Sequence, residues 1–292
     1  MSFQLVLYLS LIHVTSLLLH SLALWLLLNR IHPGSPFFSV YVALTASLAV
    51  GYFLPGRLGF PARVYLYHRI FNISTAVSFG LLGWELIVTT VIPLIFSIPA
   101  LWIFSSDPLF FAAVLFLILM LLLFAAAVYG LWRYGDGIHG LSKIRRLISP
   151  LSPLGEGLIQ TVKPLDFLML AAFSFLCLLV LTCSAWFSRV FLMSLGSPVP
   201  FLTLLSIQSL SYLAGFISLM PMGLGARELS LAVLLGEAGV RVDVATYAAV
   251  IQRVLATGIS FLLGLISMQI LWLKGSLRQI PQSQEVHSIR EP

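Results

Sequence analysis

Charged residues are scarce in this sequence. Only 9% of its 292 residues are charged, whereas a soluble globular domain carries about 25%. So few charges cannot cover the surface of a soluble protein of this length, and hydrophobic residues make up 60% of the chain. The scarcity excludes a disordered chain, a disulfide-stapled secreted domain and a nucleic-acid module. The class of protein that remains is a polytopic membrane protein.

Cysteines and enzyme motifs are also scarce. Cys177 and Cys183 are the only cysteines, and they lie about 240° apart around a helix, which suits neither a disulfide nor a metal pair and predicts packing residues. The sequence has no G-x-S-x-G, H-E-x-x-H, Walker or G-x-G-x-x-G motif. Its ten acids, most of them in loops, form no convincing catalytic pair. We therefore expect no catalytic residue, no metal and no cofactor.

The net charge of +6 resembles that of a nucleic-acid-binding protein, but in a membrane protein it indicates basic cytoplasmic loops. Such loops face anionic lipid headgroups. We therefore expect membrane lipids, and no nucleic acid, as partners.

Long apolar stretches are what the sequence has in abundance. A transmembrane helix needs about 20 apolar residues. Five stretches reach that length, at 3–28, 72–98, 108–131, 165–193 and 244–273. The first has no charge before Arg30, so it lacks the basic start of a signal peptide and is predicted to be a retained helix.

The polar stretch 132–163 divides the chain almost in half. We predict one transmembrane domain over residues 1–292. Its parts are a first half-repeat at about 1–131, a cytoplasmic linker at about 132–163, a second half-repeat at about 164–274 and a polar C-terminal tail at 275–292.

Two further apolar stretches, 36–54 and 200–220, each end in a Pro/Gly cluster. In each cluster a proline is followed by Leu-Gly at the third and fourth positions and then by an arginine, Arg63 or Arg227. Paired segments that are interrupted by Gly and Pro are typical of transporter repeats. The similarity predicts an internal repeat.

Two topologies remain open. If all seven apolar stretches cross the membrane, Lys and Arg divide ten against four between the two sides. If 36–70 and 198–240 are re-entrant hairpins, they divide ten against one, and the two halves enter from opposite faces. The positive-inside rule favours the second arrangement. We therefore predict an all-α helical bundle with five crossings and two re-entrant hairpins in inverted repeat, with the C-terminus cytoplasmic and Arg241 outside.

Glu85 and Arg253 lie within predicted spans, where a charge costs about 2.5–3.5 kcal/mol and usually faces a cavity or a partner. Small and hydroxylated residues accompany both charges at helical spacing: Ser74, Ser78 and Thr89 around Glu85, and Thr246, Thr257, Ser260, Gly264 and Ser267 around Arg253. A close helix–helix seam would have the same pattern, but the central charges favour a polar cavity. Glu85 and Arg253 each lie about thirty residues after the proline of their cluster, which gives them corresponding places in the predicted repeat. We therefore predict that they share one cavity and are paired there, directly or through water or a headgroup.

The segment Pro221-Met-Gly-Leu-Gly-Ala-Arg-Glu228 is the sharpest single feature. Gly223 and Gly225 let the backbone turn and approach a ligand, the next helix presents free N–H groups, and Arg227 offers a planar fork suited to phosphate. The alternative is a plain turn in which Arg227 and Glu228 offset each other. His13 and His20, seven residues apart, are predicted to pack or to form interhelical hydrogen bonds.

Several of these segments resemble one family. The segment from Pro221 to Glu228, the stretch 232–236, Ala248-Ala-Val-Ile-Gln-Arg253 and Gly264 resemble the C-terminal signature of the lysylphosphatidylglycerol synthase/flippase transmembrane family. The stretch from Leu54 to Arg63, followed by Ser74 to Glu85, is similar to an earlier motif of that family. The resemblance extends over most of the chain.

The resemblance implies a lipid flippase or lipid-transport protein, expected in a bacterial inner membrane. The soluble aminoacyl-transferase domain of two-domain members is not in this sequence, so synthesis of the aminoacylated lipid is not expected. A membrane-embedded enzyme acting on a lipid-linked substrate and a non-transporting scaffold of a lipid-biosynthesis complex remain alternatives, and a homo-oligomer or a lipid-biosynthesis partner stays open. The residues expected to bind an anionic headgroup are Arg63, Glu85, Gly223, Gly225, Arg227, Glu228 and Arg253.

Overall fold

The structure, a computed structural model, describes residues 2–53, 59–103, 161, 166–218, 220 and 223–275. These residues form α-helices and connecting segments, with no strand in the described ranges. The helices are α1 (Phe3–Ile31), α2 (Phe37–Phe53), α3 (Gly59–Phe71), α4 (Thr75–Ile103), α8 (Phe167–Ser194), α9 (Phe201–Ile217), α10 (Ala226–Glu237) and α11 (Val242–Leu273). The prediction of an all-α fold is confirmed.

Four of the described helices, α1, α4, α8 and α11, are long and apolar enough to cross a membrane. They correspond to four of the five predicted spans. The chain is therefore a multi-pass membrane protein. The remaining predicted span at 108–131, most of the linker at 132–163 and the tail beyond residue 275 lie outside the described residues.

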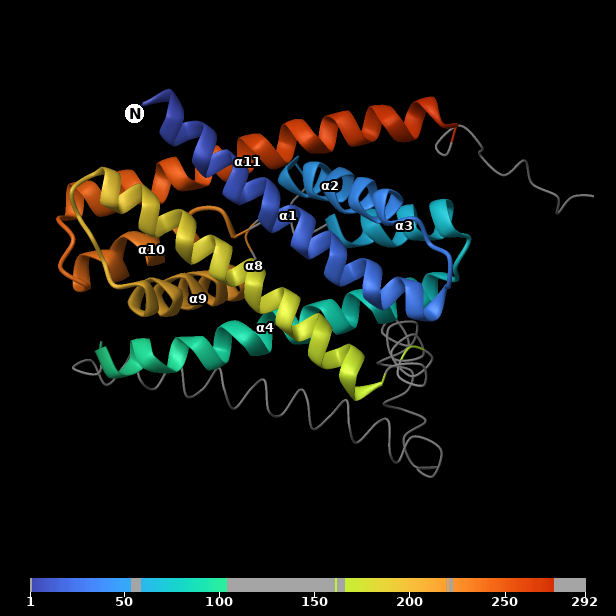
Figure 1. The fold of residues 1–292 in the computed structure, drawn as a ribbon, viewed down its shortest axis with the longest axis horizontal. Helices are drawn as coiled ribbons and strands as arrows, with labels where there is room; N and C mark the ends of the chain where they lie inside the picture. Colours follow the sequence, from blue (N-terminus) through green and yellow to red (C-terminus); the bar gives the residue numbers. More distant parts are fainter. Residues whose placement is uncertain are drawn as a thin grey trace, which may run out of the picture.

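The helices are arranged around the crossing of α1 and α8 (Figure 1). The α2–α3 hairpin and the α9–α10 hairpin approach the centre from opposite ends of the molecule, with α2 packed against α11 and α9 packed against α4. The ends of α1, α3 and α11 lie at the right of the view, whereas the start of α11 lies at the left. An ion pair between Arg30 and Asp166, with 2.5 Å between Nη2 and Oδ2, ties the end of α1 to the start of α8.

A constant shift of 164 residues relates the helices of the two halves. It carries the start of α1 at Phe3 onto the start of α8 at Phe167, and it carries α2 (Phe37–Phe53) onto α9 (Phe201–Ile217) at both ends. The same shift places α3 over the segment that contains α10, and α4 over α11. This shift is two residues shorter than the spacing of the prolines, and it pairs Glu85 with Ala249 rather than with Arg253.

The shift also superimposes two close backbone contacts inside the hairpins. A Cβ on Gly59 would lie 3.1 Å from Gly51 Cα, and a Cβ on Gly223 would lie 2.9 Å from Gly215 Cα. In each half, the glycine of the second helical segment packs on a glycine eight residues earlier. Only glycine permits this approach, so each short helix lies directly against the preceding one.

The helices α2 and α9 are shorter than the membrane-crossing helices. Each has 17 residues, which corresponds to about 25 Å of helix, whereas the hydrocarbon core of a bilayer is about 30 Å thick. Each turns back into a second short helix.

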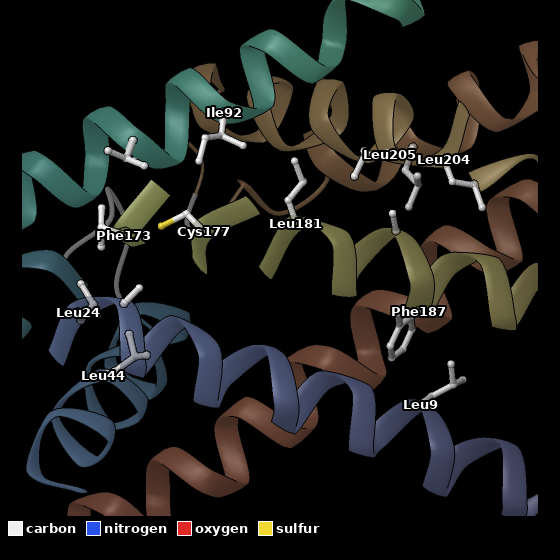
Figure 2. Close-up of a cluster of buried hydrophobic side chains, with 14 of the residues drawn as sticks. Leu9, Leu24, Leu44, Ile92, Phe173, Cys177, Leu181, Phe187, Leu204 and Leu205 are labelled. Atoms are coloured by element: carbon white, nitrogen blue, oxygen red, sulfur yellow. The ribbon is translucent and has the colours of Figure 1, made fainter. Parts of the chain in front are cut away.

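Apolar side chains from both halves form the core in Figure 2. Ile92 of α4 lies near Cys177 and Leu181 of α8, and Phe187 of α8 lies near Leu9 of α1. Cys177 is buried and Cys183 is half-buried, and neither is in a disulfide. Both cysteines are packing residues, as predicted.

Part of the small-residue pattern around Arg253 belongs to a packing seam. Ser267 of α11 shares a hydrogen bond with Thr45 of α2 (2.7 Å between hydroxyl oxygens). A Cβ on Gly264 would lie 2.5 Å from Ala49 Cβ and 2.6 Å from the Thr45 carbonyl oxygen. For this end of α11, the prediction of a polar cavity is wrong, because the glycine and the hydroxyl instead let α2 pack closely.

A methyl group at position 264 therefore has no room. We expect Gly264→Ala to lower the midpoint of thermal unfolding in detergent, with a loss of about 1–3 kcal/mol from overpacking. Gly258→Ala on the same helix is the matched control, because a Cβ there meets nothing within 4 Å. Equal midpoints for the two variants would contradict a tight α2–α11 seam.

Candidate functional site

Two adjoining cavities lie where the hairpins meet the long helices. The central cavity, of about 270 Å³, is lined by residues from both halves, including His13, Gln208 and Gln252. The hairpin-tip cavity, of about 210 Å³, lies between the two close glycine contacts and includes Gly59 and Gly215. Both cavities are lined by His20, Leu48, Tyr212, Arg227 and Arg253.

Five of the seven predicted site residues line these cavities. Arg63 and Glu85 line the hairpin-tip cavity, Glu228 lines the central cavity, and Arg227 and Arg253 line both. Gly223 and Gly225 line neither. The fold thus brings together charged candidate residues that lie far apart in the sequence.

Arg63 of α3 and Glu85 of α4 form a buried ion pair. Arg63 Nη1 donates to both carboxylate oxygens of Glu85, at 2.7 and 2.6 Å. Arg63 Nε donates to Ser47 Oγ at 3.0 Å, and His20 Nε2 lies 3.0 Å from Glu85 Oε1. Both charged residues are 4% exposed. The pair is therefore neutralised and well hydrogen-bonded by its own half of the chain.

Glu228 of α10 and Arg253 of α11 form a second ion pair. Arg253 Nε lies 2.9 Å from Glu228 Oε1, although these two atoms are not aligned for a hydrogen bond with each other. The other carboxylate oxygen, Glu228 Oε2, accepts a hydrogen bond from the backbone N–H of Gly225 at 2.6 Å. Glu228 is thus committed both to Arg253 and to the start of its own helix.

The predicted shared cavity of Glu85 and Arg253 is confirmed, but the two side chains form no direct ion pair; pairing through water or a headgroup stays a prediction. Both residues line the hairpin-tip cavity, but each carboxylate and each guanidinium pairs within its own half. The order of charges is reversed between the halves. The first half has arginine on the short helix and glutamate on the long one, and the second half has the opposite order.

Arg227 is the exception among the cavity charges. Its guanidinium lies over the Tyr212 ring, with 5.8 Å from Cζ to the ring centroid. It forms no ion pair with any residue in the described ranges, including its neighbour Glu228. The alternative of a plain turn with an Arg227–Glu228 pair is therefore wrong.

The 164-residue shift explains why Arg227 has no ion-pair partner among the described residues. It carries Arg63 onto Arg227, and it carries Glu85 onto Ala249, a residue that lines the central cavity. The second half therefore keeps the arginine but has a methyl group at the position of the acid. One positive charge is left facing the cavity.

Gly223 and Gly225 shape the turn before α10. Their φ angles are 70° and 82°, which side chains disfavour. Gly223 packs on Gly215, and a Cβ on Gly215 would lie 3.1 Å from Arg227 Cβ. This turn places Arg227 next to α9, and neither glycine lines one of the two cavities; direct contact of the glycines with a ligand stays a prediction.

A buried polar cluster on α8, α9 and α11 was not predicted from the sequence. Gln208 Nε2 donates to Ser188 Oγ at 2.5 Å, and Ser188 Oγ donates to Gln252 Oε1 at 2.7 Å. Gln252 is 7% exposed, and its Nε2 is buried without a hydrogen-bond partner. The 164-residue shift could have revealed the cluster, because it carries three apolar residues of the first half, Leu24, Leu44 and Val88, onto these polar positions.

The remaining polar candidates have mixed roles. His13 Nε2 shares a hydrogen bond of 2.8 Å with Ser260 Oγ, and both line the central cavity. The prediction of interhelical hydrogen bonds for His13 and His20 is confirmed, although both also face the cavities. Thr89 lines the central cavity, whereas Ser74 accepts a hydrogen bond from the Val77 N–H at the start of α4.

The two ion pairs predict a specific coupling pattern. Removing one partner of a buried pair strands a charge and costs about 3–5 kcal/mol. We expect Arg63→Met and Glu85→Gln each to lower the thermal stability in detergent, and the double variant to lose less than the sum, with a coupling of about 0.5–3 kcal/mol.

The matched cycle combines Glu85→Gln with Arg253→Met. The two residues belong to different pairs, so we expect a smaller coupling than for Arg63 and Glu85. A larger coupling between Glu85 and Arg253 would show that the pairs form across the halves instead.

Comparison with known proteins identifies the family. A search of curated proteins found no match. The family described as "Lysylphosphatidylglycerol synthase TM region" matches residues 1–264, which include all described helices apart from the last residues of α11. The resemblance noted in the sequence is therefore confirmed, and the chain belongs to the lysylphosphatidylglycerol synthase transmembrane-region family.

Proposed function

We propose that this protein moves a phospholipid with an anionic headgroup between the leaflets of the membrane, and that Arg227 receives the phosphate. The observation that carries this proposal is the unpaired guanidinium of Arg227 between two cavities. A charge in such surroundings is costly unless a partner compensates it. A ligand phosphate supplies that partner, and the planar fork of arginine matches it.

The charge balance of the cavities supports the same proposal. Among the described residues, three arginines and two glutamates line them. The glutamates are engaged by Arg63 and Arg253, so of these charges the one on Arg227 is available to a ligand. One phosphodiester would neutralise it. The acyl chains would remain in the surrounding lipid.

The arrangement of the hairpins supports transport by alternating access. Two hairpins that enter from opposite ends and meet at charged cavities are typical of transporters built from inverted repeats. Rocking of one half against the other would expose the cavities to one side of the membrane at a time. In this proposal the C-terminus and the 132–163 linker face the cytoplasm of a bacterial inner membrane.

The positions of the basic helix ends favour the hairpin topology. Arg30 and Arg69 lie in the last turns of α1 and α3, and these two ends lie on the same side in Figure 1. In a topology with seven crossings, α2 would carry the chain to the opposite side before Arg69.

Cysteine labelling tests the topology directly. In a Cys177→Ser/Cys183→Ser background, we expect single cysteines at positions 107 and 241 to react with an impermeant reagent from one side. A cysteine at position 145 should react from the other side. If positions 145 and 241 react from the same side, the chain crosses at all seven apolar stretches and the hairpin topology is wrong.

Substitution of Arg227 tests the function. We expect Arg227→Ala to abolish lipid movement in proteoliposomes while the protein still folds. Arg227→Lys should recover only part of the activity, because an ammonium group lacks the bidentate fork. Arg189→Ala is the matched control, since Arg189 lies over the Trp186 ring and lines neither cavity. Full activity of Arg227→Ala would refute the proposal.

A further inference from the structure

The proposed function leaves open which headgroup accompanies the phosphate. The description of the family names lysylphosphatidylglycerol, a lipid whose headgroup carries ammonium groups. An ammonium group needs acceptor oxygens, ideally a carboxylate. The acceptors and donors that the cavities leave free therefore decide which headgroup fits.

Neither cavity carboxylate is free for an ammonium group. Glu85 accepts two hydrogen bonds from Arg63 and contacts His20. Glu228 is bound to Arg253 and to the Gly225 N–H. Binding an ammonium group at either carboxylate would require breaking a buried ion pair.

The polar cluster offers a donor instead. Gln252 Oε1 accepts from Ser188 Oγ at 2.7 Å, and Gln208 Nε2 lies 3.5 Å from the same oxygen. These contacts orient the Gln252 amide so that its NH₂ group is left unpaired. Gln252 lines the central cavity, and a buried donor without a partner is unfavourable. A ligand oxygen would satisfy it, whereas an ammonium group would place donor against donor.

We propose that the central cavity selects phospholipids whose headgroup beyond the phosphate is uncharged and hydroxylated, a polyol such as glycerol, over phospholipids whose headgroup carries an ammonium group. This selectivity rests on the proposed function, with Arg227 holding the phosphate and the Gln252 amide donating to a headgroup hydroxyl oxygen. The cavity volume of about 270 Å³ lies just below the usual range for small-molecule sites and suits a headgroup without its acyl chains.

The polar cluster is specific to the second half. The 164-residue shift carries the buried Leu24, Leu44 and Val88 onto Ser188, Gln208 and Gln252. The same half lacks the acid that would neutralise Arg227. The unpaired cation and the unpaired amide therefore lie in the same half and line the same cavity.

The experiment measures the movement of fluorescently labelled lipids in phosphatidylcholine proteoliposomes. The probes are phosphatidylglycerol, lysylphosphatidylglycerol and phosphatidic acid, which has the phosphate but no polyol. We expect phosphatidylglycerol to move about tenfold faster than lysylphosphatidylglycerol. Gln252→Leu should slow phosphatidylglycerol by about threefold to tenfold, the effect of one hydrogen bond, and leave phosphatidic acid unchanged.

Gln269→Leu is the matched control, because Gln269 is an exposed glutamine of the same helix and lines neither cavity. Gln252→Glu replaces the NH₂ donor by an acceptor and adds a negative charge. We expect it to speed lysylphosphatidylglycerol and slow phosphatidylglycerol. This gain of movement also guards against a variant that simply fails to fold.

The outcomes separate the two proposals. If lysylphosphatidylglycerol moves as fast as phosphatidylglycerol, or if Gln252→Leu slows phosphatidylglycerol and phosphatidic acid equally, the headgroup selectivity is wrong although lipid transport stands. If no probe moves, or if Arg227→Ala moves every probe normally, lipid transport itself is refuted, and the selectivity with it.

Discussion

The need to compensate charge in a low-dielectric interior governs the arrangement of this protein. Arg63 and Glu85 are both 4% exposed, and each is tolerable there only because the other is within hydrogen-bonding distance. Their contact fixes α3 against α4, while Ser47 and His20 extend the network to α2 and α1. One ion pair thus ties together four helices of the first half. The side chains of this network form one wall of the hairpin-tip cavity.

The second half meets the same constraint with a different solution. Its arginine at the equivalent place, Arg227, has Ala249 where the acid would be, and Glu228 is engaged by Arg253 one helix further on. Two glycine contacts of the same geometry position Arg63 and Arg227 in their hairpins. The backbone is therefore repeated while the charges are not. In the described residues, the repeated scaffold thus has one arginine that is neutralised by a glutamate and one, Arg227, that is in no ion pair.

The fold was largely predictable from the sequence, because each membrane-crossing helix requires a long apolar stretch. Such a stretch can be recognised without knowing the tertiary contacts. Four spans and both short apolar helices were found within a few residues of their bounds. The pairing of charges was not predictable. The two prolines are two residues out of the 164-residue helix register, and Glu85 and Arg253, at about thirty residues after them, were matched only approximately. The register is set instead by backbone contacts between glycines eight residues apart, which no composition or periodicity reveals.

The buried amides show why part of a site escapes sequence reasoning. A single glutamine in an apolar helix carries no charge, so Gln208 and Gln252 did not stand out beside Glu85 and Arg253. Their significance arises only when α8, α9 and α11 bring three polar side chains into one hydrogen-bonded chain. In this hydrogen-bonded series the Gln252 carbonyl oxygen already accepts a hydrogen bond, whereas its NH₂ group has no acceptor. Charge determines whether a cavity can hold an anion, but the direction of such a neutral hydrogen-bond chain determines which uncharged groups can accompany it. In this protein, both properties come from the half whose polar residues depart from the repeat.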